Sequence, residues 1–174
     1  MKKFTAILGA AFILVTLTPC FAGSDGQAVP SKYMRKEHNE IYARIERLAQ
    51  SPGKSGQRAK DVMVVLRPHM IREEQFVLPQ LAVLKSLAFN SSAEGMYWVV
   101  KLSAKLKDEY PSMLSDHAAI TKAADRLLEA AKLENDVAAE AIASQLKSHL
   151  QEEADIVYPA AILAGEHIKC LKKS

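Results

Sequence analysis

Residues 149–153 read His-Leu-Gln-Glu-Glu, and residues 69–73 read His-Met-Ile-Arg-Glu. Both stretches have the pattern His-x-x-x-Glu, and in both a proline, Pro159 or Pro79, stands six residues after the glutamate. Residues four apart lie on the same face of a helix, so each stretch would hold its histidine and its glutamate side by side. The two stretches therefore predict two helices that carry the same pair of side chains.

A further histidine precedes each of these stretches. His38 and His117 are 79 residues apart, and His69 and His149 are 80 residues apart. An acidic residue stands directly before each of the two earlier histidines, and an isoleucine stands three residues after it. The chain therefore contains one unit, a single histidine followed by His-x-x-x-Glu, written twice.

Apolar residues recur at helical spacing through four segments, and no segment alternates apolar and polar residues as a strand would. We expect helices over about residues 31–50, 57–89, 93–133 and 136–167, separated by short polar turns. Prolines inside the second and third segments predict that both helices are kinked. The predicted fold is all-α, an up-down-up-down four-helix bundle.

The fourth segment has the most regular inward stripe, with steps that alternate between four and three residues. The stripe consists of Ile142, Leu146, His149, Glu153, Ile156, Ala160, Leu163 and His167. This narrow stripe is typical of a helix packed in a bundle. The last residue of the stripe is about 27 Å along the helix from His149, so we expect His167 to be a surface residue.

The four remaining histidines are expected at one depth in the bundle, because a helix rises about 1.5 Å per residue. His38 and His69 lie about twelve residues, or roughly 18 Å, on either side of the first turn. His117 and His149 lie about fifteen residues, or roughly 22 Å, on either side of the last turn. All four imidazoles should therefore meet in one layer.

Four histidines and two glutamates in one layer form a candidate metal site. Burying two carboxylates without a positive partner would cost several kcal/mol, and neutral imidazole with carboxylate suits a pair of iron ions. The alternative is a set of buried histidines and glutamates that pair with one another. The predicted metal ligands are His38, His69, Glu73, His117, His149 and Glu153.

Over about residues 31–163 the sequence resembles the hemerythrin-like (HHE cation-binding) proteins, on the two single histidines and the two His-x-x-x-Glu stretches. The resemblance implies a non-haem di-iron centre: four histidines bind two iron ions, joined by an oxo or hydroxo bridge, and Glu73 and Glu153 are bridging carboxylates. The Glu-x-x-His pattern of ferritin-like di-iron proteins is excluded, because no histidine here has a glutamate three residues before it.

The chain departs from the oxygen-carrying members of that family at two positions. They have a further histidine where this chain has Thr121, and an aspartate where it has Ala154. Its four-His, two-Glu set resembles members linked to repair of iron centres, which implies a coordination position left to water, O2 or NO. We expect a protein that binds O2 or NO for sensing, scavenging or carrying. The alternative is a di-iron enzyme or iron-delivery protein that reduces O2, peroxide or NO, or repairs iron centres under nitrosative or oxidative stress.

The first 22 residues have the pattern of a secretory signal peptide. Lys2 and Lys3 precede an apolar run, and Ala22 offers a small residue for cleavage. The run is shorter than the ~20 residues of a membrane span. A membrane anchor is one alternative, and a lipid anchor at Cys20 is another, which Pro19 disfavours. We expect export to the periplasm or out of the cell.

The domain organisation follows: a signal peptide (1–22), a short polar lead-in (23–30) and the bundle (31–174), with no stable membrane span in the mature chain. Without the leader, 21 basic and 20 acidic residues remain, so no basic face for nucleic acid is implied. Cys170 would then be the single cysteine and have no internal partner. The expected partner is a small diatomic ligand, and the oligomeric state is left open.

Four residues near the predicted ligands have expected supporting roles. We expect Tyr42 or Tyr158 to lie close enough to hydrogen-bond a bound ligand. Glu74 and Glu152 stand beside the predicted bridging glutamates, one position out of phase. They are expected either to orient ligand histidines or to be solvated.

Overall fold

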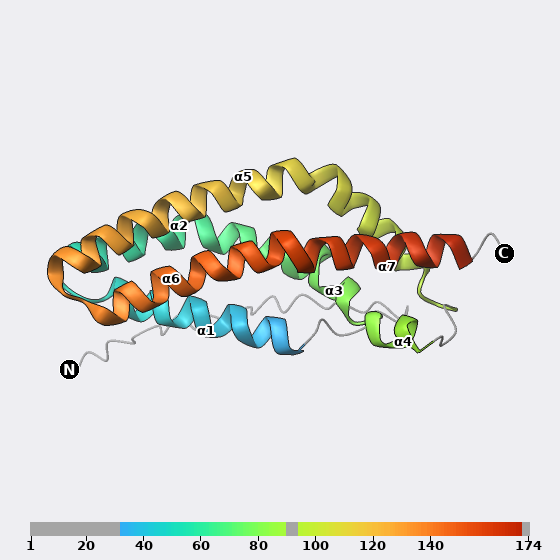
Figure 1. The fold of residues 1–174 in the computed structure, drawn as a ribbon, viewed down its shortest axis with the longest axis horizontal. Helices are drawn as coiled ribbons and strands as arrows, with labels where there is room; N and C mark the ends of the chain where they lie inside the picture. The colour runs from blue at the N-terminus through green and yellow to red at the C-terminus, as the bar shows by residue number, and fades with distance from the viewer. Residues whose placement is uncertain (1–31, 90–93, 172–174) are drawn as a thin grey trace, which may run out of the picture.

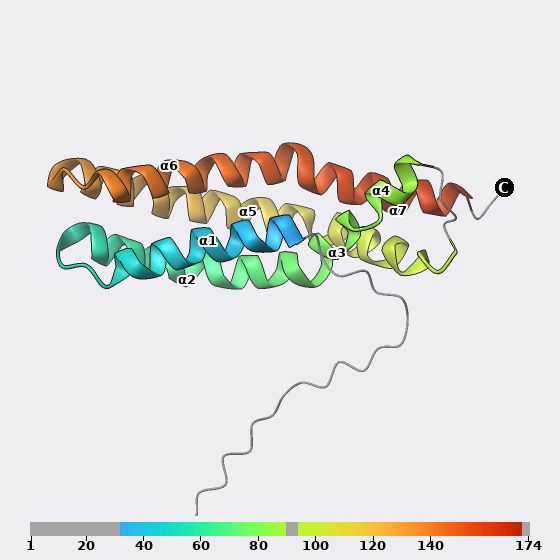
Figure 2. The ribbon, with the colours of Figure 1, turned by 90° about the horizontal axis from the view of Figure 1, so that it is seen from below.

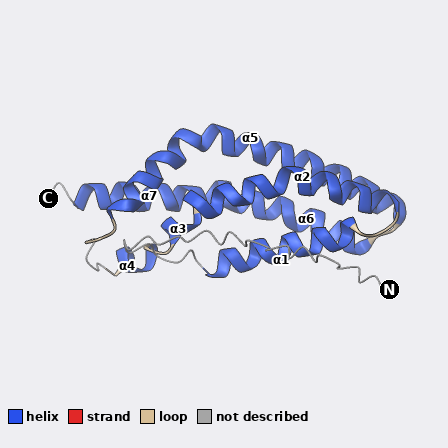
Figure 3. Cartoon of the chain, turned by 180° about the vertical axis from the view of Figure 1, so that it is seen from behind, coloured by secondary structure: helices blue, strands red, loops and turns tan. Residues whose placement is uncertain are grey.

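The computed structural model describes residues 32–89 and 94–171, and these form helices joined by short turns. The elements are α1 (Lys32–Ala49), α2 (Gly53–Phe76), α3 (Leu78–Leu81), α4 (Leu84–Ala88), α5 (Tyr97–Glu134), α6 (Val137–Glu152), η1 (Glu153–Val157) and α7 (Tyr158–Leu171). No strand occurs among the described residues (Figure 3), which confirms the all-α class for them. The predicted signal peptide and lead-in lie outside the described residues.

The long helices form a bundle. Figures 1 and 2 show α1, α2, α5 and the continuous run from α6 to α7 side by side along the long axis. α2 packs against α5, α5 packs against α6 and α7, and α1 packs against α2 and touches α6. None of the described helices is long and apolar enough to cross a membrane.

The apolar stripes of α1, α2, α5 and α6 form one continuous core. Each stripe buries side chains at steps of three and four residues, as the spacing predicts. Its larger members are Ile41, Ile45, Val62, Leu66, Ile120, Leu127, Ile142 and Leu146. This core fills the end of the bundle that contains both turns, and it fixes the rotation of each helix about its axis.

The turn between α5 and α6 also caps α2. Asn135 has a positive φ of 55° and ends α5, and Asp136 accepts a hydrogen bond from the Ala139 amide at 3.0 Å at the start of α6. Glu134 accepts bonds from the Lys54 amide at 2.7 Å and from the Ser55 amide and hydroxyl at 2.9 and 2.7 Å. The expected turn at residues 134–135 is therefore confirmed. Its hydrogen bonds connect the end of α5 to the start of α2.

The expected second helix over residues 57–89 is divided in the structure. α2 runs through Pro68 and ends at Phe76, where the Val77 amide bonds to the Glu73 carbonyl at 2.8 Å. Pro79 then lies in the first turn of the short helix α3, where a missing N–H costs no hydrogen bond. α5 contains Pro111 without interruption, although it bends over its first half (Figure 1).

The predicted inward positions of the fourth helix are wrong beyond Glu153, because η1 is one turn of π-helix. The Tyr158 amide bonds to the carbonyl five residues back, on Glu153, rather than four. Every later inward position therefore moves on by one residue. Val157, Ala161, Ala164 and Ile168 are buried, in place of the predicted Ile156, Ala160, Leu163 and His167. His167 is exposed, as expected.

α7 is held close to α5 where Gly165 faces Ser103. A Cβ atom on Gly165 would lie 2.2 Å from the Ser103 Cβ, so only glycine fits. The Ser103 hydroxyl donates to the Ile162 carbonyl at 3.1 Å. This contact fixes the helix that begins with Tyr158.

Candidate metal centre

Four long helices bring the six predicted ligands together in the middle of the bundle. His38 comes from α1, His69 and Glu73 from α2, His117 from α5, His149 from α6, and Glu153 is the first residue of η1. None of the six is more than 7 % exposed. Their nitrogen and oxygen atoms form two groups, each compact enough to hold a metal ion.

The first donor group consists of His69, Glu73, His117 and Glu153. The Nε2 atoms of His69 and His117 are 3.0 Å apart. The His69 Nε2 lies 3.4 Å from Glu73 Oε1, and the His117 Nε2 lies 3.5 Å from Glu153 Oε2. The imidazoles of this group come from α2 and α5.

The second donor group consists of His38, His149 and Glu153. Glu153 Oε1 lies 3.1 Å from His38 Nε2 and 2.9 Å from His149 Nε2. Glu73 Oε2 approaches the same His38 nitrogen at 3.6 Å. Glu153 thus belongs to both groups, with one oxygen facing each. The structure also pairs the histidines, which the sequence left open.

The donors fit a pair of cations. Glu73 Oε2 and Glu153 Oε2 are buried and accept no hydrogen bond from any described residue. The ion-pair partners of both carboxylates within the described part of the chain are histidines, which carry charge only when protonated. Two buried carboxylates with free oxygens need positive charge between them. Imidazole and carboxylate donors suit iron and other first-row divalent ions.

The histidines of the two groups differ in basicity. Burial alone would lower the pKa of His69, but Glu73 outweighs this effect and the pKa is raised. His149 behaves in the same way beside Glu153, and its pKa is raised. Burial and the neighbouring His69 lower the pKa of His117 to about 4. One imidazole with a raised pKa, His69 or His149, therefore lies in each donor group.

The two glutamates are not equivalent, although the repeat makes them look so. Burial opposes ionisation of Glu153, but hydrogen bonds from His149 and His38 hold its pKa far below the ordinary value. Burial and the nearby charge of Glu153 raise the pKa of Glu73, and His69 only partly offsets this. Glu153 is thus the carboxylate that the histidines surround.

Two acids face the outer nitrogens of two of the predicted ligand histidines. Asp116 Oδ2 lies 3.5 Å from the Nδ1 atom of His69, and Glu37 Oε1 lies 3.6 Å from the Nδ1 atom of His149. Each acid directly precedes a single histidine of the repeat, and it faces the His-x-x-x-Glu histidine of the other copy. Such contacts orient metal-binding imidazoles. Sequence reasoning missed these two acids, although their position before each single histidine was a usable signal.

The acids expected in this role do not take it. Glu152 is exposed, which agrees with the solvated alternative. Glu74 is half-buried and lines a surface hollow of about 300 Å³ between α1 and α2, which also touches His38, Tyr42 and Ile71. Tyr42 thus lies at a surface hollow beside the second donor group.

Tyr158 lies inside the first donor group. Its hydroxyl donates to Glu73 Oε1 at 2.5 Å and lies 2.9 Å from His117 Nε2 and 3.4 Å from His69 Nε2. The side chain is fully buried. Burial and the charges of Glu73 and Glu153 raise the pKa of the phenol well above its ordinary value, so it is a neutral donor in the metal-free protein.

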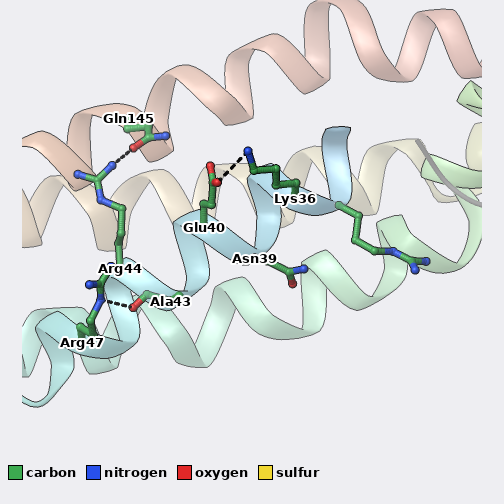
Figure 4. A pocket seen from close by; sticks show the side chains of 8 residues that line it. Lys36, Asn39, Glu40, Ala43, Arg44, Arg47 and Gln145 are labelled. Carbon is green, nitrogen blue, oxygen red and sulfur yellow. Dashed lines mark hydrogen bonds and ion pairs between the residues drawn. The ribbon is translucent and has the colours of Figure 1, made fainter. Parts of the chain in front are cut away.

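A larger hollow, of about 500 Å³, lies over α1 and reaches α6 (Figure 4). Arg44 crosses it to bond Gln145, and Lys36 pairs with Glu40 at 3.5 Å. None of its eight lining residues is one of the six predicted ligands. This hollow is a basic surface feature, and none of the predicted metal ligands lines it.

Cys170, at the far end of α7, is free and exposed.

A family model described as the hemerythrin HHE cation binding domain matches residues 29–161. Comparisons with curated proteins and with solved structures gave no match. The matched residues cover more than half of the chain and contain both donor groups. Domains of this family bind metal cations, typically iron. The chain belongs to the hemerythrin family of HHE cation-binding domains.

Proposed function

We propose that this protein is an exported non-haem di-iron protein that binds O2 or NO and serves in sensing, scavenging or carrying. The observation that carries the proposal is Glu153, whose two oxygens face two separate groups of histidines. A carboxylate in this position bridges two cations. The ligands we propose are the six residues of the two donor groups.

Each side chain has a separate task in this proposal. His69 and His117 would hold one iron, His38 and His149 would hold the other, and Glu73 and Glu153 would offer oxygens to both. Asp116 and Glu37 fix the orientation of two of the imidazoles from outside. When bound, two ferrous ions supply electrons and a coordination position for a diatomic ligand. The six side chains are buried, which limits the contact of that position with bulk water.

We also propose the up-down-up-down order of a four-helix bundle, with the run from α6 to α7 as its fourth member. α1 packs on α2, α2 on α5 and α5 on α6, so each long helix packs on the next long helix of the sequence, which supports this order. Export rests on the basic start and apolar run of residues 1–22. Expression of the full chain followed by sequencing of the mature N-terminus tests the cleavage after Ala22.

The functional proposal is tested on purified protein loaded with iron. We expect two iron ions per chain, and a visible absorption change when anaerobic, reduced protein meets O2 or NO. For a binding protein, the change reverses when the gas is removed. Metal-free protein is the control and should show no change. Loss of the band after one cycle, or repeated consumption of the gas with a reductant, would instead support the enzyme or iron-delivery alternative.

A further inference from the structure

We propose that the phenol oxygen of Tyr158 is itself an iron ligand, on the ion held by the first donor group. This inference rests on the proposed di-iron function and adds a seventh protein ligand. It also assigns the diatomic ligand to the other iron.

The position of the phenol oxygen supports coordination. First-row metal ions hold nitrogen and oxygen donors at about 2.0–2.2 Å, which puts neighbouring donors of an octahedron about 3 Å apart. The Tyr158 oxygen lies 2.5 Å from Glu73 Oε1, 2.9 Å from His117 Nε2 and 3.4 Å from His69 Nε2. The two imidazole nitrogens are themselves 3.0 Å apart. The phenol oxygen therefore lies at about this donor-to-donor distance from both imidazole nitrogens, and it also makes a short hydrogen bond to Glu73.

The π turn explains why a tyrosine reaches this place. Tyr158 follows Glu153 by five residues, and in an α-helix a residue five positions on points well away from the first. The bond from the Tyr158 amide to the Glu153 carbonyl closes a wider turn that brings the two side chains onto one face. The ring packs edge-on against Tyr110, with the centroids 6.0 Å apart, and in a tilted arrangement against His117, with the centroids 5.3 Å apart.

The count of protein donors then differs between the two ions. The first donor group with Tyr158 offers five side chains, from His69, Glu73, His117, Glu153 and Tyr158. The second offers His38, His149 and Glu153, with Glu73 Oε2 at 3.6 Å from His38. The second ion therefore keeps more free positions. It also lies beside the surface hollow that His38 and Ile71 line, which gives a small ligand a short path.

Coordination involves proton transfer and no change in oxidation state. The O–H bond of Tyr158 breaks, a bond from its oxygen to iron forms, and the proton that Tyr158 donates to Glu73 Oε1 in the metal-free protein leaves to the solvent. Two cations in the centre reverse the effect of the carboxylates, because a nearby positive ion favours the phenolate.

Resonance Raman spectroscopy of the iron-loaded, oxidised protein tests the inference. A phenolate bound to ferric iron gives a visible charge-transfer band, and excitation in that band enhances the ring vibrations of the bound tyrosine. We expect these vibrations in the wild type, and we expect them to shift when the protein contains ring-deuterated tyrosine. Tyr158→Phe should remove both the vibrations and the band while two iron ions remain. Tyr110→Phe and Tyr42→Phe are matched controls and should retain both.

Each outcome is decisive. Wild-type protein with two iron ions and no tyrosine vibrations would overturn the inference and leave the proposed function standing. Vibrations that persist in Tyr158→Phe would assign the ligand to another tyrosine and overturn it too. A chain that binds no iron would overturn the proposed function first. If Tyr158→Phe loses its iron or its fold, the isotope shift in the wild type still shows that a tyrosine is bound, and vibrations that persist in Tyr110→Phe and Tyr42→Phe exclude the two other tyrosines near the centre. Loss of the vibrations in either of these variants would overturn the inference.

Discussion

At the scale of single residues, Glu73 and Glu153 occupy equal places in the repeat, yet Glu153 contacts more of the predicted ligand histidines. Only Glu153 belongs to both donor groups. Glu153→Ala should therefore reduce the metal content from two ions per chain to near zero. Glu73→Ala should lower it less, since the second group keeps its three donors. Helicity should be largely retained in both variants, because they remove ligands rather than apolar core.

Metal analysis beside circular dichroism checks this order, with Glu152→Ala as the control. Glu152 neighbours Glu153 but is exposed, so its removal should leave two ions bound. Equal losses in Glu73→Ala and Glu153→Ala would contradict the shared position of Glu153. Two ions retained in Glu153→Ala would refute its assignment as a bridge.

Asp116 and Glu37 belong to neither donor group, yet each should affect metal affinity through the imidazole that it faces. Loss of such a contact commonly costs 10- to 100-fold in affinity. Asp116→Asn and Glu37→Gln should each weaken binding by about 10-fold or more, measured by competition with a chelator. Asp125→Asn is a suitable control, because Asp125 lies on the same helix as Asp116 and pairs with Lys147 at 2.6 Å. Unchanged affinity in both test variants would show that the imidazoles are held by packing alone.

At the scale of elements, α6, η1 and α7 depend on one extra residue. If the π turn accommodates that residue, removing it should restore an unbroken α-helix. Deletion of Ala154 should therefore keep the buried positions Val157, Ala161 and Ala164 inward and preserve cooperative unfolding. Deletion of Ala141, an exposed residue of α6, should rotate one part of the helix by about 100° relative to the other and lose the core.

Thermal unfolding of the two deletion variants measures the difference. A melting temperature close to the wild type for the Ala154 deletion, and a large loss for the Ala141 deletion, is the expected pair of results. Similar losses in both would mean that the π turn is needed for more than register.

The sequence predicted the helices and the meeting of the six residues, because both follow from spacing along rods of fixed rise. It could not predict the π turn, since the spacing up to Glu153 fits an unbroken α-helix. Only the packing of the later residues shows that one turn holds an extra residue. Pro79 and Pro159 illustrate the limit. They occupy equal places in the repeat. In the first copy helix α2 ends before Val77, whereas in the second copy the helix continues through η1 into α7. The continued helix packs along α5, a contact that no local pattern encodes.

The acids that face the Nδ1 atoms of His69 and His149 could not be predicted, for a similar reason. Neighbouring acids in the sequence, Glu74 and Glu152, were the natural candidates. The acids that face the imidazoles come instead from a different helix and the other copy of the repeat. Crossed contacts of this kind depend on how the two copies pack, which the repeat alone leaves undetermined.

At the scale of the whole molecule, the centre takes donors from all four long helical segments, so cation binding ties the bundle together. A ligand that binds only the folded state adds about 2.7 kcal/mol of stability at a concentration 100 times its dissociation constant. Removal of metal with a chelator should therefore lower the melting temperature, and reloading should restore it. The centre lies in the middle of the bundle, so the loss should affect one cooperative transition.

This difference in stability between loaded and metal-free protein should depend on pH. In the metal-free protein the pKa values of His69 and His149 are raised, so their contribution to stability is full below pH 6.5 and is lost as pH rises through the folded-state values. In the loaded protein, protons compete with cations for the same imidazoles. The difference should therefore be largest near pH 8 and shrink toward about pH 6, by about 1.4 kcal/mol for each tenfold loss of affinity per ion. His117 has a pKa of about 4, so it is neutral in the folded metal-free protein over this range and adds no pH dependence to the difference between the two forms.

Calorimetry of both forms between about pH 6 and 8, at fixed free metal concentration, checks the direction. His167→Ala is the control, because His167 is exposed and lies outside both donor groups, so its removal should leave the two curves unchanged. A difference that stays constant or grows on acidification would mean that His69 and His149 do not bind the cations. Since His69 and His149 lie in different donor groups and the pKa of each is raised, acidification should weaken the binding of both ions.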